Sequence, residues 1–205
     1  MGVLLLAGLI LAGCTPTDHP TSTAPTAVPS TTTAPATTQT PTPTAKPVYK
    51  PATATGPAQN VPIPVLPAKA KEFSKTGLEE FARYWYSTLG YAYETGDMTP
   101  MMAITDPGCT TCSGVGDMVK PWYGAGGWIV GGQMTVYSST STFHKTPDGT
   151  YQAILMIQQK QVTSYKADKS LDAALPATVA RADIVVATYS DGHWVAHKAE
   201  HLTKG

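Results

Sequence analysis

The sequence is poor in charge: it has 14 basic and 14 acidic side chains among 205 residues, with a formal net charge of zero at neutral pH. Binding a nucleic-acid backbone requires a surplus of Lys and Arg, so the composition excludes nucleic acid as a main partner. Aromatic residues are unevenly spread, and only Tyr49 precedes Phe73. We therefore expect a folded core only in the C-terminal part of the chain.

Motifs of several enzyme classes are missing. The chain contains no G-x-S-x-G nucleophile elbow and no H-E-x-x-H zinc motif. The glycine-rich stretch 124–132 lacks the preceding strand and the following helix that a phosphate-binding loop needs, so we interpret it as a connection. No complete catalytic set is visible, and the pattern indicates neither a cofactor nor a metal ion.

The first fourteen residues, MGVLLLAGLILAGC, form a short apolar run that ends in small residues, and no Lys or Arg precedes Cys14. Roughly a dozen apolar residues are too few to span a bilayer, which needs about 20, so the run is typical of a secretory signal. Its end, Leu11-Ala12-Gly13-Cys14, resembles the lipobox of bacterial lipoproteins. This resemblance implies a signal peptide over residues 1–13 and a diacylglycerol on the thiol of Cys14. An ordinary signal peptide with a chance Cys is the alternative.

A linker follows the signal. Residues 15–55 contain 15 Thr, and residues 15–68 contain 13 Pro and only three charged side chains. Such a composition cannot supply a core, so we expect residues 14–68 to form a lipidated, disordered tether in extended polyproline geometry. Thr-Pro tracts also resemble mucin-like stalks, which leaves O-glycosylation open.

Residues 69–205 have a globular composition and begin with a predicted helix. Apolar residues recur at helical spacing from Leu78 to Tyr93. Ser74 or Thr76 could start this helix, since Thr76 with Glu79 three residues later forms a capping-box pattern. Gly96 stands where a C-terminal cap belongs.

Shorter helices and then strands are expected downstream. Thr99-Pro100 and Asp106-Pro107 favour helix starts, the second helix running towards Met118 before Pro121 breaks the chain. The remaining runs predict strands at residues 133–144, 151–165, 177–190 and 193–202. Helices followed by an antiparallel meander indicate an α+β fold, with the helices on one face of a curved sheet.

This arrangement resembles the cone-shaped SnoaL-like (nuclear transport factor two-like) fold. The segments Tyr91-Ala92-Tyr93-Glu94-Thr95-Gly96-Asp97 and Asp106-Pro107-Gly108-Cys109-Thr110-Thr111-Cys112 also resemble a family of uncharacterised actinobacterial lipoproteins, over roughly residues 69–205. That resemblance implies a location and a fold, and no catalytic role.

The motif Cys109-Thr110-Thr111-Cys112 is the clearest candidate for a chemical role. In an exported domain, two thiols at this spacing favour a short-loop disulfide. A redox dithiol is the second interpretation, although redox pairs normally follow a strand in a βαβ unit. Half of a zinc site is the third, and it would need two further ligands beyond these thiols.

Three histidines, His193, His197 and His201, are spaced by four. On a helix this spacing could hold a metal. After a turn the segment favours a strand, where neighbouring histidines would lie ~13 Å apart at ~3.3 Å per residue, too far to share one ion.

The Asp191-Gly192 pair predicts a tight hairpin and therefore a register. Tyr189 would pair with Trp194, and Asp183 would lie opposite Glu200, with Arg181 and Lys198 on the same face to compensate the like charges. If that face lined a pocket, Asp183 and Glu200 could act as an acid–base pair. If the other face did, His197 could be a general base. A solvated, salt-bridged surface is the third possibility.

These observations predict a lipoprotein on the outer face of a bacterial cell membrane, whose domain binds a small ligand or a cell-envelope partner. A small-molecule enzyme with a cone-shaped pocket and a thiol–disulfide protein are the rivals. A pocket of a few hundred Å3 with apolar groups plus Asp or His would favour the enzyme. Exposed aromatics such as Trp122, Tyr123 or Trp128 would favour a partner.

Overall fold

The computed structural model describes residues 47–202, which form one structural unit with its own core. The predicted signal peptide, the lipidation site Cys14 and the linker up to residue 46 lie outside the described residues. None of the helices in the described part is long and apolar enough to cross a membrane.

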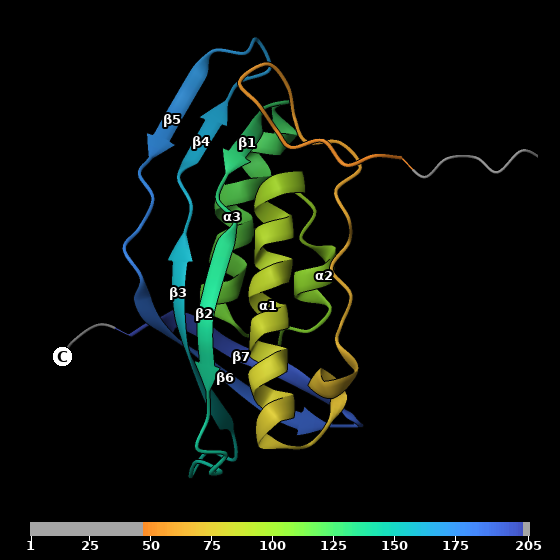
Figure 1. The fold of residues 1–205 in the computed structure, drawn as a ribbon, viewed down its shortest axis with the longest axis vertical. Helices are drawn as coiled ribbons and strands as arrows, with labels where there is room; N and C mark the ends of the chain where they lie inside the picture. The colour runs from red at the N-terminus through yellow and green to blue at the C-terminus, as the bar shows by residue number, and fades with distance from the viewer. Residues whose placement is uncertain (1–46, 203–205) are drawn as a thin grey trace, which may run out of the picture. The chain divides into compact units, whose positions relative to one another are not determined.

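The unit is a mixed α+β fold, as predicted, but its strands form two antiparallel sheets instead of the single curved sheet expected (Figure 1). Its helices are η1 (Ala68–Lys71), α1 (Lys75–Thr95), α2 (Thr99–Met102) and α3 (Thr110–Gly124). Its strands are β1 (Trp128–Gly131), β2 (Met134–Thr140), β3 (Tyr151–Gln159), β4 (Val162–Tyr165), β5 (Leu171–Leu175), β6 (Arg181–Ser190) and β7 (His193–His201). The sheet orders are β1-β4-β5 and β2-β3-β6-β7.

Helix α1 is the central element and packs against β1, β2 and β3, while α3 packs against β7 and β1. In Figure 1, β2 runs along α1, whereas β6 and β7 cross behind the lower part of α1 at a slant. The core lies between these helices and the sheets, and the buried side chains of α1 supply much of it.

The ends of α1 follow local chemistry. The hydroxyl of Ser74 accepts a hydrogen bond from the backbone N–H of Gly77 at 3.0 Å, so Ser74 is the N-cap. The predicted capping box at Thr76 is wrong, because Glu79 accepts a hydrogen bond from the N–H of Ser141 at 2.8 Å instead. Gly96 ends the helix with φ of 77°, a left-handed conformation that favours glycine, as predicted.

Helix α3 begins later than expected and continues further. Asp106 does not cap it; its carboxylate accepts from the N–H of Gly108 at 2.7 Å and closes a turn. The helix starts at Thr110 with Cys109 as the N-cap, and it passes through Pro121 to Gly124. Pro121 lies one turn before the end, so it removes a single hydrogen bond without ending the helix.

One predicted long strand, residues 151–165, is divided between the two sheets as β3 and β4. The division coincides with Gly131 and Gly132, which have φ of 82° and 80° and join β1 to β2. A Cβ on Gly131 would lie 2.0 Å from the carbonyl oxygen of Gln161, so only glycine allows this crossing. The predicted glycine-rich connection therefore contains strand β1, and strand β5 was not predicted.

The Asp191-Gly192 hairpin forms with its expected first pairs, Ser190 with His193 and Tyr189 with Trp194. A bulge between Val186 and Ala187 then shifts the register by one residue. Asp183 pairs with His201, and Ile184 with Glu200. The predicted pairing of Asp183 with Glu200 is therefore wrong, because a simple count from the turn cannot include an unpaired residue.

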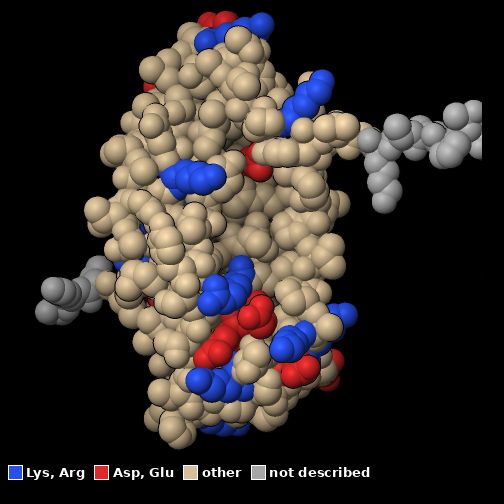
Figure 2. Space-filling model, viewed as in Figure 1, with Lys and Arg blue, Asp and Glu red and all other residues tan. Residues whose placement is uncertain are grey.

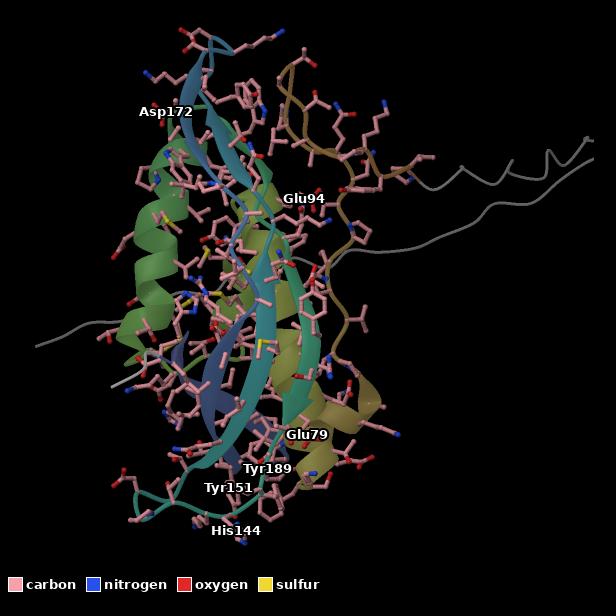
Figure 3. All side chains as sticks on the ribbon, turned by 60° about the vertical axis from the view of Figure 1, so that its left-hand side comes forward. Glu79, Glu94, His144, Tyr151, Asp172 and Tyr189 are labelled. Carbon is pink, nitrogen blue, oxygen red and sulfur yellow. A yellow bond between two sulfur atoms is a disulfide. The ribbon has the colours of Figure 1, made fainter. Side chains whose placement is uncertain are left out.

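Residues 47–67, which we call the strap, belong to the folded unit, although their composition predicted a disordered linker. The indole N–H of Trp128 donates to the carbonyl of Thr53 at 2.8 Å, and the hydroxyl of Tyr49 donates to Glu94, which Figure 3 shows beside the strap. An extended Pro-rich segment has carbonyls that a folded domain can bind, and this the composition does not reveal.

The lower end of the unit in Figure 3 is aromatic. Tyr151 and Tyr189 lie there, with ring centroids 5.5 Å and 5.0 Å from that of Phe73.

Figure 2 shows acidic and basic side chains together in the lower part of its view, where α1 begins. The pairs Lys75–Glu79 and Glu80–Arg83 belong to this part of α1. Opposite charges at these spacings stabilise the exposed side of a helix modestly.

Candidate functional site

A cavity of about 290 Å3 lies between α1, α3 and the strands β2, β3, β6 and β7. Much of its wall is aromatic and aliphatic, and includes Trp85, Leu89, Tyr93, Val115, Met134 and Ile157. Its polar groups are Thr111, Gln159, Arg181, Asp183, Glu200 and His201. A mostly apolar cavity with a few converging polar groups is the usual form of a small-molecule site.

Secondary-structure spacing brings these groups together. Trp85, Leu89 and Tyr93 are four residues apart on α1 and therefore share one side of the helix. Arg181 and Asp183 are two residues apart on β6 and therefore point to the same face of the sheet. The helix supplies the apolar wall and the strand supplies the charged one.

Asp183 is the central polar group of the cavity, and it is almost fully buried, at 1% exposure. One carboxylate oxygen accepts a hydrogen bond from the hydroxyl of Tyr86 at 2.5 Å, and the other lies 2.6 Å from Nδ1 of His201. Burial raises the pKa of Tyr86, and the charge of Asp183 and its hydrogen bond raise it further. Tyr86 therefore remains a protonated donor that satisfies part of a buried carboxylate.

The bulge in the hairpin decides which partner Asp183 receives. Because β7 is shifted by one residue, His201 lies beside Asp183, while Glu200 pairs with Lys198 at 3.2 Å. The predicted acid–base pair of Asp183 and Glu200 is replaced by a chain from Tyr86 through Asp183 to His201. The His201 side chain is 47% exposed, so this chain runs from the core to solvent.

Arg181 is the second charged group of the cavity. Its Nε atom is buried and has no hydrogen-bond partner within the described residues. Its positive charge acts on Tyr86 and Tyr93, where it opposes the rise in pKa that burial causes. The guanidinium side chain lines the cavity together with these two tyrosines, and it forms no ion pair with a carboxylate among residues 47–202.

The other two histidines lie apart from this cavity. Nε2 of His197 lies 2.8 Å from the hydroxyl of Thr188, and its Nδ1 lies 3.5 Å from Asp106. His193 contacts the backbone carbonyl of Asp191 at 3.2 Å. The three histidines thus have three different partners, and residues 47–202 contain no cluster of His, Cys, Asp and Glu side chains that could hold a metal ion.

Cys109 and Cys112 are joined in a disulfide, with their Cα atoms 5.3 Å apart. Their side chains are buried, at 2% and 0% exposure. A thiolate must reach a sulfur atom to exchange with it, so this burial argues against a redox site. The disulfide closes the first turn of α3, the helix that carries Thr111 and Val115 to the cavity wall.

The three aromatic residues whose exposure would have favoured a partner surface make contacts inside the domain. Trp128 is 3% exposed and stacks on Tyr165, with ring centroids 5.6 Å apart. The hydroxyl of Tyr123 donates to the carbonyl of Tyr93 at 2.8 Å. Trp122 packs against the core and is only partly exposed.

The sequence did not predict that Tyr86 and Arg181 belong to the site. Tyr86 lies three and four residues from Leu89 and Ala82, so helical spacing could have placed it on the buried side of α1. Arg181 was expected only to compensate the like charges of Asp183 and Glu200. The register counted from the turn placed Glu200, and not His201, opposite Asp183, and only the bulge brings Asp183 and His201 together.

Comparisons with known proteins give a family and distant structural likenesses. No curated protein matches the sequence. The intermembrane space region of the chloroplast protein ARC6 is similar, with a TM-score of 0.44 and 12% identity over 64% of this chain and 98% of that one. Aln2 from a Streptomyces species is similar with a TM-score of 0.35 and 14% identity, over 63% and 94%. Both likenesses are too distant to bear on the function.

The family match is more extensive than either of these likenesses. It covers residues 47–200 and thus includes the strap, both sheets, the disulfide and the polar groups of the cavity up to Glu200. The chain therefore belongs to the family of unknown function DUF6318.

Proposed function

We propose that this protein is a lipid-anchored domain outside the cell membrane that binds a small organic molecule in the cavity beside Asp183. The observation that carries the proposal is the cavity itself, about 290 Å3 in volume, with apolar walls and a few converging polar groups.

The location rests on the sequence. The motif Leu11-Ala12-Gly13-Cys14 and the Thr- and Pro-rich residues that follow it support an acylated Cys14 and an extracytoplasmic tether. A buried disulfide fits an oxidising compartment outside the cytosol. Labelling with an alkyne fatty acid should mark the protein in membranes and should leave a Cys14→Ser variant unmarked. An unmarked wild-type protein in the cytosol would contradict the anchor.

We also propose that the domain is a variant of the SnoaL-like cone. The arrangement that supports this is a long helix laid on an antiparallel sheet, with the cavity between them. An experimental structure in which the four-stranded sheet is flat and no space lies beneath α1 would contradict it.

An enzyme is the second candidate, and the chain Tyr86–Asp183–His201 favours it. A carboxylate that orients an imidazole is a common arrangement for a general base. Asp183 holds Nδ1 of His201 while nearly half of the imidazole side chain remains exposed at the cavity. Once a ligand is known, its conversion by the wild type and its unchanged recovery from His201→Gln would establish catalysis.

The binding proposal is tested by filling the cavity. Ala199 lines it, so Ala199→Trp should occupy the space, whereas Ala174→Trp places the same side chain on the exposed surface of β5. Full-length proteins purified from native membranes are compared by native mass spectrometry and by analysis of extracted small molecules. We expect a bound molecule in the wild type and in Ala174→Trp, and its loss in Ala199→Trp.

The control and the contradicting results are distinct. Circular dichroism must show that both variants are folded. A molecule retained by a folded Ala199→Trp protein would place binding elsewhere. An empty wild-type protein that captures one envelope protein equally well with and without the filled cavity would favour partner binding.

A further inference from the structure

We propose that the cavity is selective for small organic acids, whose carboxylate Arg181 binds while an apolar body fills the remaining space. The inference rests on the proposed small-molecule function and specifies the chemistry of the ligand. Three observations carry it: the place of Arg181 in the cavity wall, the prior engagement of the neighbouring carboxylates, and the apolar residues of the same cavity.

The first observation is the state of Arg181. Buried polar groups are nearly always hydrogen-bonded, because leaving one unpaired costs about 1–3 kcal/mol and more for charged groups. Arg181 has a buried Nε atom without a partner, the one such side-chain atom within residues 47–202. Because that atom has almost no accessible surface, a ligand would contact the outer N–H groups of the same guanidinium, which lines the cavity.

The second observation concerns the two carboxylates that share the cavity with Arg181. Both oxygens of Asp183 are engaged, one by Tyr86 and the other by His201. Glu200 is paired with Lys198. Neither carboxylate forms an ion pair with Arg181. Within the described residues, the positive charge of the guanidinium is therefore not neutralised by a bound carboxylate.

The chemical fit favours a carboxylate over other groups. A guanidinium presents planar donors that match the two oxygens of a carboxylate, and such charge-assisted hydrogen bonds are strong in a site with little water. Tyr93 and Ile157 line the same cavity, and Ile157 is the cross-strand neighbour of Arg181. The acid group therefore lies at the edge of an apolar space that suits a ring or a short aliphatic chain.

The test uses 4-fluorobenzoate and its neutral isostere 4-fluorobenzamide, with fluorine line broadening as the measure of binding. The full-length protein is held in phosphatidylcholine nanodiscs, and empty nanodiscs give the background. We expect the wild type to bind the acid about tenfold more tightly than the amide or better, as a charge-assisted pair implies. Arg181→Met should abolish the preference, and Arg181→Lys should retain part of it.

Lys160→Met is the matched control, because it removes one exposed positive charge between β3 and β4 and lies outside the cavity. Equal loss in Lys160→Met and Arg181→Met would show general charge attraction and overturn the proposal. Equal binding of both probes, lost in Ala199→Trp, would overturn selectivity for acids and leave the small-molecule site standing. Absence of binding by either probe would contradict the acid proposal, while the extraction experiment decides the site separately.

Discussion

Replacing Tyr86 by Phe tests the buried polar chain most directly. The substitution removes one oxygen atom and keeps the ring that packs on Trp85, with centroids 5.2 Å apart. It also removes the 2.5 Å hydrogen bond to Asp183, a carboxylate at 1% exposure. Hydrogen bonds to charged groups contribute about 1.5–3 kcal/mol, so Tyr86→Phe should lower the free energy of unfolding by about 2 kcal/mol.

The control is Tyr91→Phe, on the same helix. The hydroxyl of Tyr91 makes no hydrogen bond with a described residue, and the side chain is partly exposed, so we expect a change within ~0.5 kcal/mol. Urea unfolding of the full-length protein, followed by tryptophan fluorescence, measures both variants. Equal free energies for Tyr86→Phe and Tyr91→Phe would refute the claim that the Tyr86 hydroxyl satisfies a buried charge.

Three further predictions concern the disulfide, one tyrosine and the strap. Replacing Cys109 and Cys112 together by Ser should lower the free energy of unfolding in urea by ~2 kcal/mol, the loop-closure value for so short a loop. An unchanged urea midpoint would show that the disulfide does not constrain α3. Burial raises the pKa of Tyr123 to about 12 from an ordinary value of 10.0. Its contribution to stability is therefore complete below pH ~10 and should fall by about 2 kcal/mol towards pH ~12, a fall that Tyr123→Phe should reduce. Tyr49→Phe removes the bond to Glu94, so hydrogen exchange should become faster in the strap alone, and exchange as slow as in the wild type would show that other contacts hold it.

The sequence predicted those features whose backbone conformation depends only on residues close together in the chain. The start of α1 near Ser74 and its end at Gly96 follow from capping chemistry within one turn. The Asp191-Gly192 hairpin follows from the left-handed conformations of both residues, with φ of 51° and 80°. These features were predicted because their energies arise between residues close together in the chain.

Elements that depend on distant contacts were not predicted. Strand β1 lies in the glycine-rich stretch and exists because Gly131 allows the chain to pass Gln161 closely. The strap has the composition of a linker, yet it is held by hydrogen bonds from Trp128 and Tyr84. Composition reports the average preference of a segment and contains no information about donors supplied by another part of the chain.

For the site, the sequence determined that Asp183 and His201 would lie on neighbouring strands of one hairpin, because the turn and the alternation of the strands are local. The tertiary structure decided that they meet, since one unpaired residue at the bulge moves β7 by a single position and brings an imidazole where a carboxylate was expected. It also decided that Arg181 lies inside a cavity, because burial depends on how α1 and α3 cover the sheet. Pairing register and burial are properties of the packed chain, and that is why residues already recognised as chemically interesting could not be assembled into a site before the fold was known.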